Sequence, residues 1–342
     1  MDVLHKAIGT PEMDPIDTLR LFFLLSAATV CEFAIVPQLP NDFPSSKLTE
    51  RCANLFQAFS ISIPSSLRTR FLVYGPRTTS TPAATAERPE INRSTFLDYL
   101  ATWQVPHRYF THFYIASVLS SVFWFFQLAC RGTAFQLVAA RMSEEHLQQS
   151  MSLTQVLICW ILLAIQGGRR LWESYKFAKP SSSQMSVAHW FLGITFYMAA
   201  GMAIWVEGCG AIRSYNLTLD DIKMTNAPTA RTFFCVPLFL MMSGLQHDCH
   251  HFLFSLKKYT VPDHPIFRTV VCPHYGAECL IYLSLALLAA PPGHLVNKTM
   301  LTCLGFVAVN LALTARTTKD WYKEKFGLAS VQDRWLMIPW VY

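Results

Sequence analysis

The sequence predicts an all-α protein, a polytopic bundle of transmembrane helices. Hydrophobic residues make up 52% of the 342-residue chain and charged residues only 15%, against about 25% charged in typical soluble domains. Mean hydropathy is +0.28. Apolar residues gather in runs of membrane-spanning length, and Lys and Arg gather between alternate runs. A soluble enzyme is therefore excluded, and nucleic acid is not an expected partner.

The apolar runs set the expected number of spans. A helix that crosses a bilayer needs roughly 20 mostly apolar residues, and seven stretches meet or approach this length. Leu48–Ile63 is also apolar, but it carries Glu50 and Arg51, so we expect an interfacial or re-entrant segment there. The seven expected spans are Ile16–Pro37, Thr111–Cys130, Met151–Gln166, Val187–Val206, Thr232–Leu256, Tyr275–Ala290 and Leu295–Ala315.

The basic residues predict how the bundle is oriented. With seven spans, one face receives residues 38–110, 167–186, 257–274 and 316–342, which hold 20 of the 28 Lys and Arg residues. The positive-inside rule assigns such a face to the cytosol. We therefore expect a luminal N-terminus and a cytosolic C-terminus. Of the N-x-S/T sequons, the one at Asn216 is the candidate for a luminal site.

The densest polar stretch, Gln246–Glu278, lies between two apolar runs. Ionisable groups at the ends of membrane spans are costly, which makes Gln246, His250 and Glu278 candidate functional residues. A structural role, helix-to-helix hydrogen bonding, is the alternative. The sequence Arg169-Arg170-x-x-Glu173 is a second cluster of this kind. Its spacing allows Glu173 to pair with one Arg and leave the other for a ligand.

The His residues in this stretch raise the question of a metal. His247, His250 and His251 spell H-x-x-H-H, and on a helix they lie within one turn. Membrane di-iron hydroxylases use several such boxes, and this chain has no second one. We therefore expect no metal site and keep a di-iron hydroxylase or desaturase as an alternative.

Nucleotide binding must be sought among the helices, because the chain has neither a Walker sequence nor a G-x-G-x-x-G after a strand. Basic residues that suit phosphates recur on the expected cytosolic face. Contact with anionic lipid headgroups is the alternative role for them. They are Arg169, Arg170, Lys257, Lys258, Lys319, Lys323 and Lys325.

The C-terminal third resembles the steroid 5α-reductase family. CPHYGAE, at Cys272–Glu278, is similar to that family's P-N-Y-x-x-E signature. WYKEKF, at Trp321–Phe326, followed by the closing IPW, is similar to its F-Y-x-x-K-F…P-F ending. His274 departs from the pattern, since the family usually has Asn there.

Within the family, the chain resembles the polyprenol (polyprenal) reductase branch. Three segments carry this resemblance: Val105–Leu119, Gln166–Ser174 and the C-H-x-x-L-x-x-L-K-K spacing at Cys249–Lys258. It covers about Val105–Tyr342. We therefore expect residues 105–342 to form the membrane reductase domain, and residues 1–104 to supply the first span plus a cytosolic or interfacial loop.

The resemblance implies an activity. It implies NADPH as the cofactor and reduction of the α-isoprene double bond of polyprenal or polyprenol, on the route to dolichol and N-glycosylation. The implied partners are a long-chain polyprenyl lipid and the endoplasmic reticulum bilayer, with no obligate protein partner. A steroid or enoyl-thioester reductase of the same fold is the nearest alternative, and a non-enzymatic membrane scaffold or transporter is a more distant one.

The resemblance also assigns site residues. An acid and a donor to the carbonyl oxygen are needed, and the branch signature offers Tyr109, His112 and Tyr114 as catalytic candidates. The steroid enzymes' tyrosine acid falls on Gly167, which cannot replace it. The implied cofactor-binding residues are Arg170, Gln246, His250, Lys257, His274, Tyr275, Glu278 and Tyr322.

Overall fold

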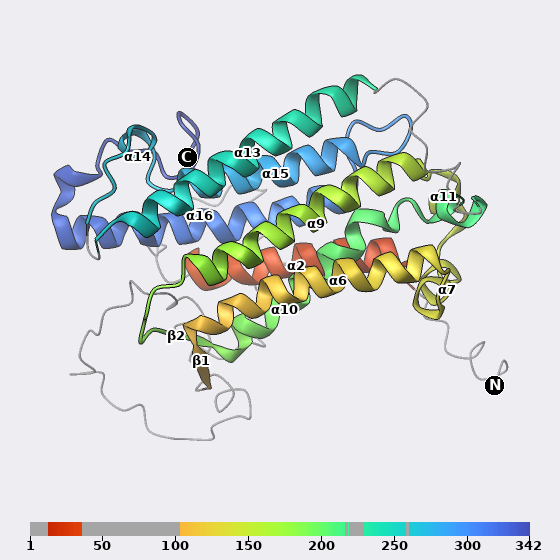
Figure 1. Ribbon diagram of the computed structural model, residues 1–342, viewed down its shortest axis with the longest axis horizontal. Helices are drawn as coiled ribbons and strands as arrows, with labels where there is room; N and C mark the ends of the chain where they lie inside the picture. Colours follow the sequence, from red (N-terminus) through yellow and green to blue (C-terminus); the bar gives the residue numbers. More distant parts are fainter. Residues whose placement is uncertain (1–12, 36–102, 216–217, 219–228, 258–259) are drawn as a thin grey trace, which may run out of the picture.

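A computed structural model shows long helices that run side by side along the longest axis (Figure 1). The structure describes residues 13–35, 103–215, 218, 229–257 and 260–342. The prediction of a helical protein is confirmed. Leu48–Ile63, Lys258 and Asn216 lie outside the described residues.

A long helix occupies each of the seven stretches that the sequence predicted. Helix α10 has the predicted bounds, whereas α9 and α16 continue well past the ends of their apolar runs. Both extensions carry charged pairs at helical spacing, such as Arg169 with Glu173 and Asp320 with Lys323. The seven helices are α2 (Pro15–Ile35), α6 (Thr111–Ala129), α9 (Leu153–Lys176), α10 (Val187–Val206), α13 (Ala230–Ser255), α15 (Pro273–Leu288) and α16 (Lys298–Phe326).

Three of the described helices are long and apolar enough to cross a membrane. They are His107–Ala129, Val187–Val206 and Lys298–Phe326. Large apolar side chains on the outside of the bundle, such as Phe126 on α6 and Phe234 on α13, are more than half exposed. Exposed apolar surface of this extent is typical of a face that meets lipid. The seven-span count and the orientation stay predictions.

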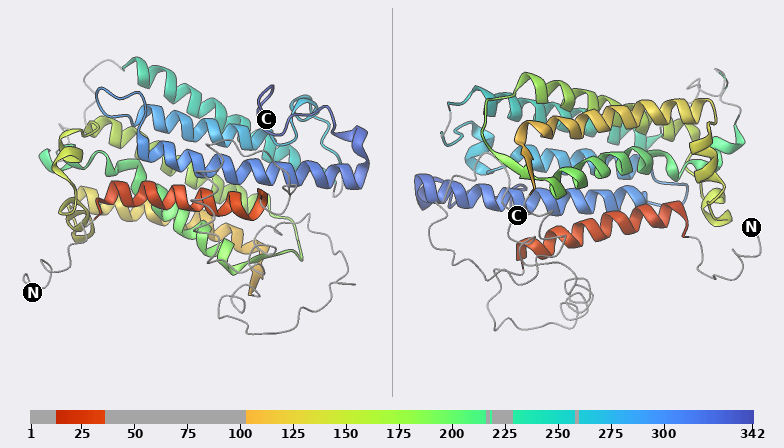
Figure 2. Two further views of the ribbon diagram at one scale, coloured as in Figure 1. Left: turned by 180° about the vertical axis from the view of Figure 1, so that it is seen from behind. Right: turned by 90° about the horizontal axis from the view of Figure 1, so that it is seen from below.

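The helices pack in pairs that join distant parts of the chain. α13 packs on α15 at one edge of the bundle, and α2 packs on α16 (Figure 2). α6 contacts both α9 and α10. Gly193 on α10 lies directly against the ring of Phe113, and Gly201 lies against Ser120, with no room for a Cβ at either position. Small residues allow this close approach of helices in membranes.

One end of the bundle gathers the described parts of the segments that the sequence assigned to a common face (Figure 1). Strand β1 (Gln104–Pro106) pairs antiparallel with β2 (Gln184–Ser186) there. The C-terminal segment crosses the entry to α15, where the backbone N–H of Cys272 donates to the carbonyl of Leu336 at 2.9 Å. This end also carries η2 (His107–Phe110), α14 (Pro265–Thr269) and η3 (Leu328–Ser330).

The opposite end carries α7 (Thr133–Ala139), α8 (Glu144–Gln148) and α11 (Cys209–Ser214). The buried carboxylate of Glu207 ties three helices together there. It lies 3.0 Å from the guanidinium of Arg20 on α2 and accepts from the backbone N–H of Thr299 on α16, also at 3.0 Å. Asn297 caps α16, accepting from the N–H of Met300 at 2.8 Å.

Candidate active site

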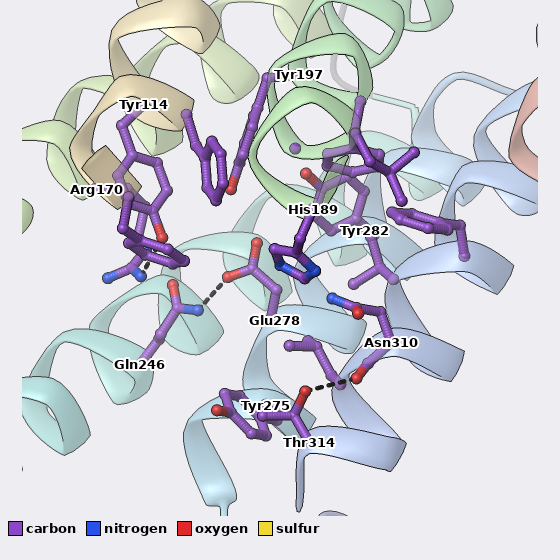
Figure 3. Close-up of a pocket in the computed structure, with 18 of the residues that line it drawn as sticks. Tyr114, Arg170, His189, Tyr197, Gln246, Tyr275, Glu278, Tyr282, Asn310 and Thr314 are labelled. Carbon is purple, nitrogen blue, oxygen red and sulfur yellow. Dashed lines mark hydrogen bonds between the residues drawn. The ribbon is translucent and has the colours of Figure 1, made fainter. Parts of the chain in front are cut away.

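A cavity of about 160 Å³ opens inside the bundle, near the end that carries the β1–β2 pair. Helices α6, α9, α10, α13, α15 and α16 contribute to its wall (Figure 3). A cavity of roughly 150 Å³ accepts a benzene-sized ring, so this one has room for a ring but not for a whole dinucleotide. The apolar part of the wall consists of Phe110, Phe113, Leu192, Phe196, Phe306, Val307 and Leu311.

Most of the side chains that the sequence assigned to a site come together on the polar part of this wall. They arrive from four helices, α6, α9, α13 and α15, whose sequences are far apart. The structure thus joins the N-terminal branch signature to the C-terminal family motif in one cavity. The residues that it brings together are Tyr114, Arg170, Gln246, His250, Tyr275 and Glu278.

Tyr109 and His112 do not line the cavity. Their rings lie 4.5 Å apart and pack on Trp190 of α10, at 6.4 Å and 6.0 Å between ring centres. They belong to the same sequence motif as Tyr114, but η2 and the first turn of α6 direct them to a different neighbour. Of the three expected catalytic candidates, the cavity therefore holds Tyr114 alone.

The remaining three expected residues lie outside the wall of the cavity. His274 is buried, with its ring 5.3 Å from that of His250 and 4.2 Å from that of Tyr275. Tyr322 is buried near the end of α16, and Lys257 is exposed just beyond α13. All three belong to the end of the bundle that carries α14 and the β1–β2 pair.

The sequence analysis missed five polar residues of the wall. Asn310 was detectable, because an amide inside the apolar run of α16 is costly unless it has a function. The tyrosines gave no signal, since aromatic residues in a helix interior are usually core residues. The five are His189, Tyr197, Tyr282, Asn310 and Thr314.

An amide–carboxylate network lies between α9, α13 and α15. Gln246 donates through Nε2 to Glu278 (Figure 3), and Gln166 donates to Oε1 of Gln246 at 2.9 Å. Arg169 donates to both amide oxygens. Gln166 and Gln246 are almost fully buried. Such buried polar groups keep a fixed orientation because each has its partner.

Glu173 has polar partners on two helices, α9 and α13. Its carboxylate pairs with both Arg169 and Arg170, whereas the sequence predicted one pair and one Arg left over. His247 and His250 of the H-x-x-H-H box both turn their Nδ1 atoms to the same carboxylate, at 2.7 Å and 2.8 Å. In the part of the chain that the structure describes, no three His, Cys, Asp or Glu side chains are arranged to hold a metal.

Arg170 links this cluster to the cavity. Its Nη1 faces Glu173, and its Nη2 donates to the phenol oxygen of Tyr114 at 2.5 Å. The guanidinium carbon also lies 4.7 Å from the centre of the Tyr114 ring. Because the phenol oxygen accepts from a cation, its own O–H becomes a stronger donor. That O–H is suited to an oxygen atom that gains negative charge during a reaction.

A neighbouring part of the polar wall offers a different kind of contact (Figure 3). Gln246 and Glu278 present donors and acceptors close together, which suits a carboxamide or a sugar hydroxyl. The cavity therefore combines a cation-backed phenol, an amide–carboxylate pair and an apolar wall.

The sequence of the chain is similar to those of several known proteins. The family model of 3-oxo-5-alpha-steroid 4-dehydrogenases matches residues 183–342. An uncharacterized protein of Schizosaccharomyces pombe is 30% identical over 243 residues, which cover 70% of this chain and 79% of that protein. The polyprenal reductase of Saccharomyces cerevisiae is 28% identical over 271 residues, 78% of this chain and 84% of its own. The polyprenal reductase of Xenopus laevis is 26% identical over 274 residues, which cover 71% of this chain and 80% of that protein.

The matched residues include much of the cavity wall. The family model includes α10, α13, α15 and α16, and the relatives cover most of their own length. The chain therefore belongs to the steroid 5α-reductase family, in the branch that contains these polyprenal reductases.

Proposed function

We propose that this protein is an NADPH-dependent polyprenal reductase, which saturates the double bond next to the aldehyde of a long-chain polyprenal. The observation that carries the proposal is the Arg170-backed phenol of Tyr114 in a cavity with an apolar wall. The names of the relatives in Saccharomyces cerevisiae and Xenopus laevis support the same substrate class.

The chemistry favours the aldehyde over the alcohol as the substrate. The double bond of an allylic alcohol is electron-rich and accepts hydride poorly. Conjugation with an aldehyde makes the β carbon electrophilic, and the carbonyl oxygen takes up the electron pair that the double bond releases. Polyprenal, NADPH and one proton thus give the saturated dolichal and NADP⁺.

The cofactor-binding proposal rests on the amide–carboxylate wall. NADPH, when bound, supplies the hydride that adds to the β carbon. Gln246 and Glu278 fit its carboxamide and ribose hydroxyl groups, and Tyr275 and His250 complete that side of the cavity. The cavity takes only the nicotinamide end, so the phosphates would lie outside it. Lys257 is exposed at this end of the bundle and is suited to contact them.

The catalytic proposal assigns the carbonyl oxygen to Tyr114. Its O–H would donate to that oxygen as negative charge develops, and Arg170 would stabilise the charge through the phenol oxygen. The α carbon needs a proton from a second hydroxyl group. Tyr197 and Tyr282 are two further phenols on the wall.

The location proposal follows from the substrate. A polyprenyl chain does not enter water, so it would reach the apolar wall of α10 and α16 from the bilayer. We place the protein in the endoplasmic reticulum membrane, with seven spans and a cytosolic C-terminus. There it would serve dolichol synthesis and protein N-glycosylation.

The test is NADPH oxidation by detergent-purified protein, with polyprenal and polyprenol offered separately. Oxidation with polyprenal and none with polyprenol supports the proposal. Oxidation only with an enone steroid or an enoyl thioester would support a reductase that acts on a different substrate. No oxidation with any of them, in protein that melts cooperatively, contradicts the proposal.

A further inference from the structure

Glu173 is a buried carboxylate that the proposed reaction does not use directly. It lies on α9, one turn after Arg169 and Arg170, and its side chain is only 1% exposed. It is not part of the cavity wall. A buried carboxylate is costly unless charged partners and hydrogen bonds compensate for lost hydration.

The partners of Glu173 are shared evenly between its two oxygens. Oε1 faces Nη1 of Arg169 and Nδ1 of His247, and Oε2 faces Nη1 of Arg170 and Nδ1 of His250. Each oxygen thus takes one guanidinium and one imidazole. The R-R-x-x-E sequence on α9 and the H-x-x-H spacing on α13 are two halves of a single cluster.

Two of these four partners, Arg170 and His250, belong to the cavity wall. The guanidinium group is planar and rigid, so fixing one of its nitrogens fixes the direction of the other. With Nη1 held by Glu173, Nη2 of Arg170 points at the phenol oxygen of Tyr114. Nδ1 of His250 also lies 2.8 Å from Nη1 of Arg170, and it can accept from that nitrogen only in the tautomer in which it does not donate to Glu173.

We propose that Glu173 is a positioning residue of the reductase: it holds Arg170 on Tyr114 and touches neither substrate nor cofactor. The inference rests on the proposed function, because it gives the Tyr114 hydroxyl its role. It assigns one task to two sequence motifs, the paired arginines and the histidine box, that otherwise suggest a phosphate site and a metal site.

Glu207 provides a matched control. It is also a buried carboxylate, and it also pairs with an arginine, Arg20, and with Thr299. It lies at the opposite end of the bundle from the cavity. If burial and pairing alone determined the effect on activity, Glu173→Gln and Glu207→Gln would change kcat to the same extent. Both substitutions should lower the melting temperature, and only Glu173→Gln should lower kcat in the folded protein.

The decisive experiment is a double-mutant cycle on kcat with polyprenal, using wild type, Glu173→Gln, Tyr114→Phe and the double variant. We expect Glu173→Gln to lower kcat about tenfold or more and Tyr114→Phe to lower it about 10²–10³-fold. If Glu173 acts through Arg170 on Tyr114, the double variant stays within about twofold of Tyr114→Phe. Losses that multiply in the double variant, or a wild-type kcat in Glu173→Gln, would overturn the inference.

Two further measurements test the inference if Glu173→Gln does not fold or if the protein does not reduce polyprenal. Glu173→Asp retains the charge, so its kcat should lie between those of Glu173→Gln and wild type. If Glu173→Gln does not fold, Glu173→Asp takes its place in the cycle. Cryo-electron microscopy of wild type and the variant gives a readout without turnover. Arg170 released from Tyr114 in the variant supports the inference, and Arg170 unmoved contradicts it. If wild type does not reduce polyprenal, the proposed function fails and this structural comparison still decides the role of Glu173.

Discussion

The Nη2 atom of Arg170 lies 2.5 Å from the phenol oxygen of Tyr114, and the guanidinium carbon lies 4.7 Å from the centre of the same ring. Arg170 comes from α9 and Tyr114 from α6, so the contact depends on the packing of these two helices. It places a permanent positive charge behind a hydroxyl group on the wall of an apolar cavity. The proposed chemistry needs a group of this kind at the carbonyl oxygen.

The first prediction concerns that hydroxyl group. Tyr114→Phe removes the donor and keeps the ring, so kcat should fall about 10²–10³-fold, as for the loss of one oxyanion donor elsewhere. The measurement is steady-state NADPH oxidation with polyprenal. Tyr175→Phe is the control, because Tyr175 lies on α9 but is 65% exposed. A kcat for Tyr114→Phe within a factor of two of wild type would show that the Tyr114 hydroxyl takes no part in the reaction.

A second prediction concerns the carboxylate of the polar wall. Oε2 of Glu278 accepts from Gln246 and from Gln166, the latter at 3.4 Å. Glu278→Gln removes the charge and weakens these hydrogen bonds, which are worth about 1.5–3 kcal/mol each when one partner is ionised. NADPH should bind about tenfold more weakly, or worse, in a fluorescence titration.

The control for that variant is Glu145→Gln, because Glu145 is exposed on α8 at the other end of the bundle. Its affinity for NADPH should match that of wild type. Equal affinity and turnover in Glu278→Gln would show that Glu278 does not contact the cofactor.

The third prediction separates binding from chemistry. Lys257 is exposed beyond α13 and outside the cavity, so Lys257→Ala should raise KM for NADPH about tenfold and leave kcat unchanged. Added salt should raise KM more in wild type than in the variant, because it screens an exposed charge. Lys298→Ala, at the opposite end, should change neither constant. A fall in kcat without a change in KM would contradict the proposed contact with phosphate.

The fourth prediction concerns a sequon. Asn297 starts an N-K-T sequence, but its side chain is fully buried, accepts from the N–H of Met300 and donates to the carbonyl of Ala289 at 3.1 Å. We therefore expect no glycan at Asn297, and a destabilisation of about 1 kcal/mol in Asn297→Ala from the lost helix cap. Glycosidase treatment followed by electrophoresis tests the first part and thermal unfolding the second. A mobility shift that disappears in Asn297→Ala would contradict this assignment.

The sequence was a good guide to the helices and a partial guide to their ends. Apolar runs predicted all seven positions, because hydropathy reports burial in lipid or protein directly. Hydropathy did not predict the end of α9, which was expected at Gln166 and lies at Lys176, or the end of α16. Charged residues end an apolar run without ending a helix, since pairs such as Arg169 with Glu173 form within one turn.

The site was partly predictable for a related reason. Polar residues in or beside apolar runs, such as Gln246 and Glu278, were visible because they are costly there. Tyr197 and Tyr282 were not, because tyrosine in a helix is ordinary. The pairing of Glu173 with two histidines depends on how α9 meets α13, which spacing along one helix cannot show.

The central claim is that hydride reaches the β carbon of a polyprenal, and deuterium transfer tests it most directly. Purified protein is given polyprenal and NADPH that carries deuterium at the transferable position. Mass spectrometry and NMR then locate the deuterium in the product. The account predicts dolichal with one deuterium at the β carbon and the aldehyde hydrogen unlabelled. Deuterium at the former carbonyl carbon, with the double bond intact, would show that the enzyme reduces the aldehyde instead and would contradict the account.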